Sequence, residues 1–160
     1  ERLLIMTTGN TDRIEKEFVL KAPQERVWRT ITDSEEFGRW FRVALERREF
    51  TPGATVVGHM TYPGYEHLRF EMVIEEVEPR RRISWRWHPY AIDPGVDYSR
   101  EPTTLVEFEL QEVSGGTQVR IVESGFDEIP AERRVEAFRM NADGWRQQAE
   151  NLERHVGASR

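Results

Sequence analysis

The chain has 160 residues, of which 23 are Lys or Arg and 29 are Asp or Glu, so its formal net charge is −6. This negative balance, with a single tight basic run at residues 80–82, gives no reason to expect a nucleic-acid partner. The chain has no cysteine, which excludes disulfides, thiolate nucleophiles and cysteine-ligated zinc, and its length suits one domain with one core.

The N-terminal stretch predicts neither a membrane span nor a signal peptide. Its apolar run, residues 3–6, is far shorter than the roughly 20 residues that cross a bilayer. We therefore expect a cytoplasmic protein with a flexible leader at residues 1–12, a single domain at residues 13–156 and a tail at residues 157–160. Met6 is a candidate natural start, which leaves the origin of residues 1–5 open.

The domain is predicted to begin with a strand and two short helices. Residues 13–20 have the composition of a strand, and Pro23 then begins a short helix. Asp33, followed three residues later by Glu36, forms the capping pattern of a second helix. The buried side of this second helix is expected to be Phe37, Trp40 and Phe41.

The middle of the chain predicts an antiparallel meander. Pro-Gly pairs, Pro79 and the Ser-Gly-Gly sequence at 114–116 are turn signals between apolar segments. The expected strands are residues 44–50, 55–62, 68–78, 81–88, 103–113 and 117–123. Side chains alternate along them, as at Ile83, Trp85 and Trp87, so that one face of the sheet is apolar and aromatic.

Residues 130–156 are predicted to form one long helix. Its apolar residues recur at steps of three and four and would share one buried face: Val135, Phe138, Ala142, Trp145, Ala149, Leu152 and Val156. Gly144 lies in mid-helix, where glycine costs about 1 kcal/mol relative to alanine, so either a close contact or open space is expected beside Trp145. Together these elements predict an α+β fold in which a curved antiparallel sheet of about seven strands wraps around the helix.

Several segments together resemble the START-like or SRPBCC superfamily, which has the helix-grip fold. Within it, the chain is similar to homologues of the C-terminal domain of the activator of the 90-kDa heat-shock-protein ATPase. The resemblance rests on Ala22-Pro23 with Val27-Trp28, Trp40-Phe41, Pro52-Gly53, Ile83-Ser84-Trp85, Gly116-Thr117 through Glu123-Ser124-Gly125-Phe126, and Gly144-Trp145 with Leu152.

This resemblance implies a cavity between the sheet and the C-terminal helix that accepts hydrophobic small molecules. The superfamily also includes lipid carriers, hormone receptors, polyketide cyclases, toxin-sequestering proteins and chaperone activators, so fold alone does not fix function. Eukaryotic chaperone activators carry a separate N-terminal domain for which this chain has no room, and a chaperone partner is therefore not expected. The sequence has no flavin, iron–sulfur or nicotinamide signature, and no cofactor is expected.

Glu123 is the candidate catalytic residue. Because side chains alternate along a strand, an inward Val119 and Ile121 would place the Glu123 carboxyl inside the cavity. Burial would raise its pKa towards that of a general acid or base. The alternatives are a bulge at Val122 that turns the side chain away, or an ion pair with an arginine of the helix, such as Arg134 or Arg139.

The expected ligand site is an aromatic cavity with few polar anchors. Its predicted residues are Trp40, Tyr62, Phe70, Met72, Trp85, Trp87, Phe108, Ile121, Glu123, Phe138, Asn141 and Trp145. The long loop at residues 89–102, which is rich in polar and aromatic groups, is either a candidate gate or a surface loop held by Pro89, Pro94 and Pro102. His59, His67 and His88 come from separate segments without ligand spacing, so no metal site is expected.

The leading hypothesis from the sequence is binding of an apolar or aromatic small molecule between the sheet and the helix. One alternative is a cyclase, dehydratase or hydrolase that uses a cavity carboxylate. Another is a protein-interaction module related to chaperone activators. A homodimer is compatible with the sequence, which does not determine the oligomeric state.

Overall fold

The computed structural model describes residues 10–158, so residues 1–9 of the expected leader and residues 159–160 of the expected tail lie outside the described residues. Seven antiparallel strands form one sheet in the order β1-β7-β6-β5-β4-β3-β2. The strands are β1 (Arg13–Leu20), β2 (Val43–Leu45), β3 (Thr55–Met60), β4 (Arg69–Glu78), β5 (Arg82–Trp87), β6 (Thr104–Val113) and β7 (Gly116–Ser124). The helices are α1 (Gln24–Thr32), α2 (Ser34–Phe41), the single 3-10 turn η1 (Phe126–Glu128) and α3 (Ala131–Ala158).

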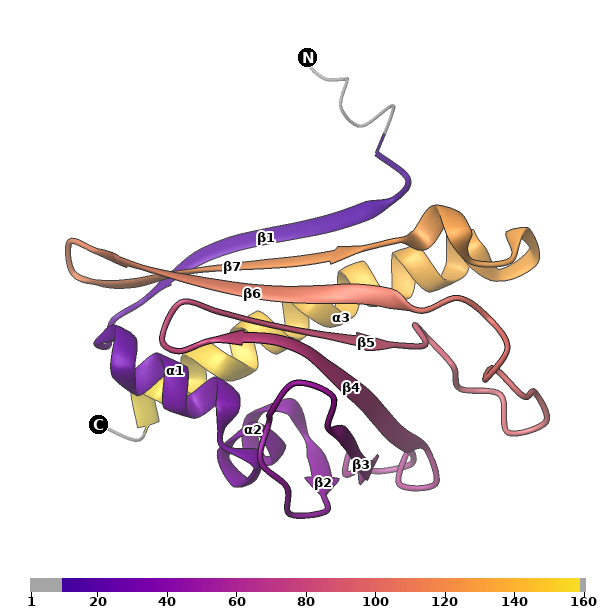
Figure 1. Cartoon of the computed structure of the whole chain (residues 1–160), viewed down its shortest axis with the longest axis horizontal. Helices are drawn as coiled ribbons and strands as arrows, with labels where there is room; N and C mark the ends of the chain where they lie inside the picture. The colour runs from indigo at the N-terminus through magenta and orange to yellow at the C-terminus, as the bar shows by residue number, and fades with distance from the viewer. Residues whose placement is uncertain (1–9, 159–160) are drawn as a thin grey trace.

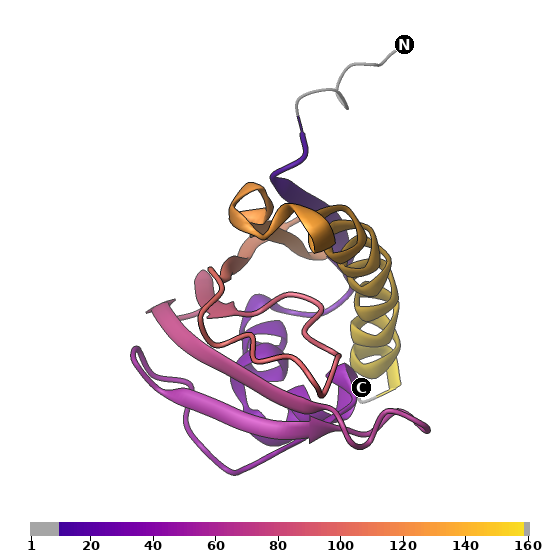
Figure 2. The same cartoon turned by 90° about the vertical axis from the view of Figure 1, so that its right-hand side faces the viewer.

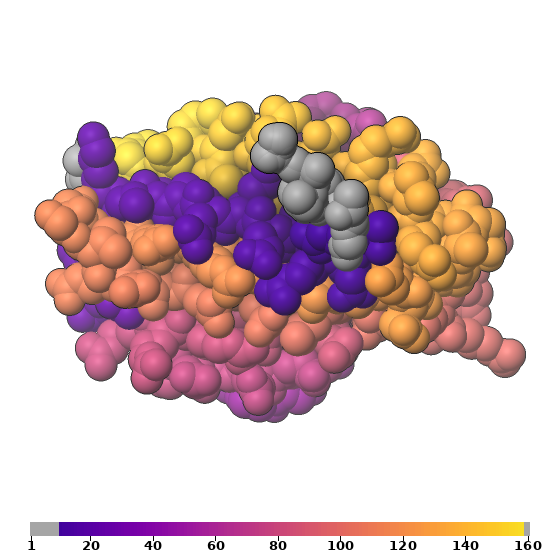
Figure 3. Space-filling model, turned by 90° about the horizontal axis from the view of Figure 1, so that it is seen from above, coloured from indigo at the N-terminus to yellow at the C-terminus, as the bar shows by residue number. Residues whose placement is uncertain are grey.

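The sheet curves around the long helix α3, as Figures 1 and 2 show. Strand β1 pairs with β7 along its whole length and also lies against α3, so it closes one side of the grip (Figure 3). Helices α1 and α2 fill the other end of the concave side. The predicted α+β fold, with its two short helices and its gripped C-terminal helix, is confirmed.

Local sequence signals explain the first helices. The side chain of Asp33 accepts a hydrogen bond of 3.0 Å from the backbone N–H of Glu36, which confirms the predicted cap of α2. The apolar residues of α2, namely Phe37, Trp40 and Phe41, are buried as expected. They form an aromatic cluster that begins at α2 and continues into the sheet.

The predicted strand at residues 44–50 is wrong in extent, since β2 spans only Val43–Leu45. Residues 46–49 are all charged and all exposed, so they provide no apolar face to hold against the core. Phe50 is buried after this exposed segment rather than as part of the strand.

Alternation along the central strands places the expected side chains in the core. Phe70 and Met72 from β4, Trp85 from β5, Phe108 from β6 and Ile121 from β7 are all buried. The indole of Trp85 stacks on Phe108 with ring centroids 5.3 Å apart. The centre of the grip is therefore packed with side chains.

The predicted buried face of α3 is correct at Trp145, Leu152 and Val156 but wrong at Val135, whose exposed fraction is 74%. Ala137, which lay outside the predicted stripe, is 0% exposed. At 3.6 residues per turn these two positions lie roughly 80° to either side of Trp145 around the helix axis. The helix is thus rotated about its axis relative to the apolar periodicity.

Polar residues account for this rotation. Gln148 and Asn151 are buried on α3, where Gln148 Nε2 donates to the carbonyl of Phe41 at 3.0 Å and Asn151 Nδ2 donates to the Tyr62 hydroxyl at 3.1 Å. Burying a polar group is tolerated when it is hydrogen-bonded. A search for apolar residues alone cannot detect these positions as part of the buried face.

We predict that Trp145→Ala lowers the free energy of unfolding by about 3–5 kcal/mol, because it empties a packed aromatic site on α3. Val135→Ala, on the same helix, should change it by less than about 0.5 kcal/mol. Urea denaturation of both variants measures these values. Equal losses in the two variants would contradict the described rotation of α3.

Candidate functional site

A groove of about 710 Å³ lies between α3, the ends of β3 and β5, and the loops that follow these strands. Its aromatic residues are Phe41, Tyr62, Tyr65, Trp87, Tyr90 and Trp145. Its aliphatic residues are Met60, Leu68, Ile92 and Met140. Asn141, Asp143, Gly144, Arg146, Gln147 and Gln148 complete the lining from α3.

Two indoles form the inner wall of the groove. Trp87 at the end of β5 and Trp145 on α3 stack with ring centroids 5.7 Å apart and an interplanar angle of 23°. Phe41 lies within 6.2 Å of both rings by centroid distance. The wall is apolar, with Trp145 almost fully buried in it and Trp87 as the indole that is partly exposed.

Glu123 lies beneath this wall and is 0% exposed. Val119 and Ile121 are buried on the same face of β7, as the period-two pattern predicted. Strand β7 pairs continuously with β1 through Glu123, so the alternative of a bulge at Val122 is wrong. The carboxyl group therefore points into the concave side of the sheet.

Four side chains donate hydrogen bonds to the Glu123 carboxyl. Trp145 Nε1 donates to Oε1 at 2.8 Å, whereas Trp87 Nε1 donates to Oε2 at 2.8 Å and Thr104 Oγ1 to Oε2 at 2.6 Å. Asn141 Nδ2 contacts both oxygens, at 3.0 and 3.1 Å. These donors come from β5, β6 and α3, so one carboxyl connects three elements to β7.

The alternative of an ion pair between Glu123 and Arg134 or Arg139 is also wrong. Arg134 Nε donates instead to the carbonyl of Ile129 at 2.9 Å, and within residues 10–158 no arginine or lysine forms an ion pair with Glu123. Burial raises the pKa of Glu123, although the hydrogen bonds from Thr104 and the two tryptophans act in the opposite direction.

Arg133 ties the loop between β5 and β6 to the start of α3. Its guanidinium forms an ion pair with Glu101 at 2.6 Å, donates to the Pro89 carbonyl at 2.9 Å and lies 4.7 Å from the centre of the Tyr98 ring. Tyr90 has φ of 51°, in the left-handed region that few non-glycine residues adopt. Arg133 thus holds both ends of the loop that supplies Tyr90 and Ile92 to the groove.

The structure divides the predicted ligand residues between the groove and the core. Tyr62, Trp87, Asn141 and Trp145 line the groove. Trp40, Phe70, Met72, Trp85, Phe108 and Ile121 are buried in the core instead. Phe138 packs on Phe126 with centroids 5.1 Å apart.

Sequence reasoning missed several parts of the site. The strand pattern does not distinguish Thr104, Met60 or Leu68 from other strand residues, the helix pattern places Phe41 only on a buried side, and Tyr65 has no predicted role. Phe41 could have been identified as a groove residue from the sequence, because it is the last apolar residue of α2 and so lies at the end of the core. The Arg133–Glu101 pair carries no local signal, since 32 residues separate its members.

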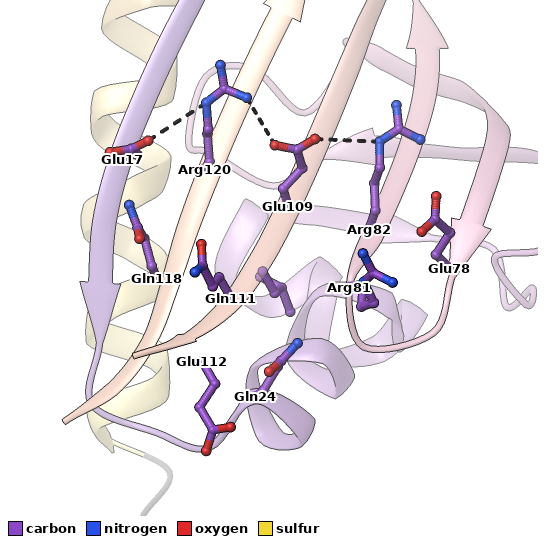
Figure 4. Close-up of a pocket in the computed structure, with 11 residues that line it drawn as sticks. Glu17, Gln24, Glu78, Arg81, Arg82, Glu109, Gln111, Glu112, Gln118 and Arg120 are labelled. Carbon is purple, nitrogen blue, oxygen red and sulfur yellow. Dashed lines mark hydrogen bonds and ion pairs between the residues drawn. The ribbon is translucent and has the colours of Figure 1, made fainter. Parts of the chain in front are cut away.

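A second hollow, of about 440 Å³, lies on the outer face of the sheet (Figure 4). It is crossed by a row of ion pairs in which Arg120 contacts Glu17 and Glu109, and Arg82 contacts Glu109. Arg82 also binds Glu76 and Glu107. Since Arg82 and Arg120 of this hollow are already paired with carboxylates of neighbouring strands, the apolar groove is the better candidate for a ligand site.

Neither a metal site nor a membrane span is found in the described part of the chain. Among residues 10–158, no three His, Asp or Glu side chains gather in a way that could hold a metal ion. None of the helices over the same residues combines the length and apolar character needed to cross a bilayer.

Comparisons with known proteins identify relatives of this fold. A family model described as Activator of Hsp90 ATPase homolog 1-like protein matches residues 21–157. No curated protein matches the sequence.

Among solved structures, protein MLL2253 from Mesorhizobium loti is 22% identical with a TM-score of 0.72, covering 92% of this chain and 98% of that one. Protein NE0264 from Nitrosomonas europaea is 21% identical with a TM-score of 0.72, covering 94% and 97%. DynU16, from the dynemicin biosynthetic locus, is 23% identical with a TM-score of 0.70 over 93% of this chain, which spans 48% of DynU16. At these identities the likeness shows the fold alone.

The raised pKa of Glu123 predicts a specific pH dependence of stability. The folded protein keeps this proton at pH values where the unfolded chain has lost it, so the stabilisation is complete below the ordinary pKa of 4.5 and is lost as pH rises through the folded pKa. Glu123→Gln cannot titrate. The unfolding free energy of wild type minus that of the variant should therefore fall as pH rises above about 4.5 and then level off.

Urea denaturation of both proteins at a series of pH values measures this difference. The comparison cancels other titrating groups, such as Glu36, whose pKa is lowered, despite partial burial, by hydrogen bonds with His155 and Arg26. A difference that stays constant across the series would show that the Glu123 pKa is not raised.

Proposed function

The chain belongs to the family of Activator of Hsp90 ATPase homolog 1-like proteins, and from that premise we propose that it binds a flat apolar or aromatic small molecule in the groove beside α3. The match covers residues 21–157, so the family resemblance found in the sequence is confirmed. The family and its helix-grip fold commonly provide sites for small hydrophobic ligands. The class of ligand has to be inferred from the residues that line the groove.

The size and lining of the groove carry this proposal. Its volume of about 710 Å³ lies within the roughly 300–1,000 Å³ that is usual for small-molecule sites. Aromatic and aliphatic side chains dominate its lining, and the partly exposed Trp87, backed by the buried Trp145, offers an aromatic wall. An apolar ring placed against these indoles would lose its hydration and gain dispersion contacts.

Gly144 supports the same proposal. A Cβ atom added at this position would meet nothing within 4 Å, although the residue lines the groove beside Trp145. The mid-helix glycine predicted either a close contact or open space beside Trp145, and open space agrees with the structure. The absent side chain leaves room for a ligand at a cost to helix stability.

The geometry supports binding more strongly than proton transfer by Glu123. Both carboxyl oxygens are occupied by protein donors, and the group has no exposed surface from which to reach a ligand. We assign it the role of fixing Trp87, Asn141 and Trp145 in the groove wall. A pure protein-interaction module would have no need for a groove of this volume.

Gly144→Phe tests the proposal because a phenyl ring can fill the groove without disturbing the core. We expect 2-fluoronaphthalene to quench the tryptophan fluorescence of the wild type and its affinity to fall at least about tenfold in this variant. Gly144→Ala is the matched control. It should retain binding and raise the free energy of unfolding by about 0.5–1 kcal/mol, since alanine favours the helix.

Isothermal titration calorimetry provides an independent measure of the same affinities. Absence of binding to the wild type would contradict the proposed function. Undiminished binding to a folded Gly144→Phe protein would mean that the probe occupies another site, and would contradict the assignment of this groove.

A further inference from the structure

The hydrogen-bond donors of the groove wall are already used by the protein. The indole N–H groups of Trp87 and Trp145 both point to Glu123, at 2.8 Å. An indole nitrogen carries one proton and cannot accept a hydrogen bond. Neither tryptophan is therefore available to donate to a ligand, although both rings face the groove.

Asn141 is held in one orientation by the same carboxyl. Its Nδ2 lies 3.0 and 3.1 Å from the two Glu123 oxygens, so the amide NH₂ faces the buried acid. At pH values above the pKa of Glu123 the carboxylate can only accept, so the reverse orientation of the amide would set two acceptors against each other. The chemistry of the partners therefore fixes which atom of the amide is nitrogen.

This orientation leaves Oδ1 of Asn141 as an unused acceptor. Asn141 lines the groove and is half-buried, and no donor within residues 10–158 contacts its Oδ1. An acceptor that a ligand covers without a donor loses its hydration and gains nothing in return. The groove is thus complementary to a ligand group that donates a hydrogen bond to Asn141 Oδ1.

Several other polar groups of the groove are engaged with one another. The Tyr62 hydroxyl accepts from Asn151 at 3.1 Å, and Gln148 donates to the Phe41 carbonyl and accepts from Asn151. Arg146 and Asp143, at the exposed rim, pair at 3.3 Å. Asn141 Oδ1, held by the same carboxyl as the two indoles, is the acceptor that we assign to selection among flat ligands.

We propose that the groove selects flat apolar molecules that carry an N–H or O–H donor, which binds Oδ1 of Asn141. This inference rests on the proposed function and specifies its ligand class. Glu123 acts as a positioning residue for this selection, because it determines the direction of the Asn141 amide. Ligands of the same shape that only accept hydrogen bonds leave Oδ1 unpaired and bind more weakly.

Two probes of nearly equal size test the inference, namely 2-naphthol, which has a hydroxyl donor, and 2-fluoronaphthalene, which has none. The measured quantity is the Kd of 2-fluoronaphthalene divided by the Kd of 2-naphthol. Because the probes differ in intrinsic hydrophobicity, the informative result is the change of this ratio between proteins. We expect the ratio to fall about tenfold from wild type to Asn141→Leu, which is similar in size and lacks the acceptor.

Asn141→Ala repeats the test with a smaller side chain, and Val135→Ala, at an exposed position of the same helix outside the groove, is the control. The ratio should fall in the first of these and stay at the wild-type value in the second. An unchanged ratio in both Asn141 variants, with both probes still bound, would overturn the inference and leave the proposed function standing. Binding of neither probe to the wild type would overturn both.

A measurement on the wild type alone covers the case in which the Asn141 variants do not fold. The side-chain carbonyl ¹³C resonance of Asn141 should shift when 2-naphthol is added, and shift far less with 2-fluoronaphthalene. Equal shifts with the two bound probes would show that no hydrogen bond to Oδ1 forms, and would overturn the inference.

Discussion

The buried carboxyl of Glu123 is the contact on which the site depends. It has no ion-pair partner within residues 10–158, and it is accommodated by donors from β5, β6 and α3. An unpaired buried carboxyl is costly, and each donor that faces it reduces that cost. The rotation of α3 that turns Val135 outward also brings Asn141 and Trp145 to Glu123.

The groove follows from the same constraint. With their N–H edges committed to Glu123, Trp87 and Trp145 stack, and the partly exposed Trp87 lines the same groove as the gap left by Gly144. Arg133 then fixes the loop that carries Tyr90 to the rim. The polar network lies under the groove rather than in it, so the surface offered to a ligand is mostly apolar, with one oriented acceptor.

The sequence predicts those features that depend on neighbouring residues. Alternation from Val119 to Glu123 gives the inward direction of the carboxyl, and Asp33 with Glu36 gives the start of α2. The apolar period of α3 fails at its first turns because its buried face includes Gln148 and Asn151, whose partners are distant in the chain. Aromatic residues were correctly expected at the sheet–helix interface, but composition cannot separate those that fill the core from those that line an open groove.

One measurement tests the central role of Glu123 most directly, namely a pH titration of the indole N–H proton resonances by NMR. If the carboxyl accepts from both indoles and burial raises its pKa, the Trp87 and Trp145 resonances should shift together, with one midpoint above the ordinary glutamate value of 4.5. The resonances of Trp28 and Trp40, which do not contact Glu123, should not follow that midpoint. Indole resonances of Trp87 and Trp145 that move separately, or not at all, would contradict the account.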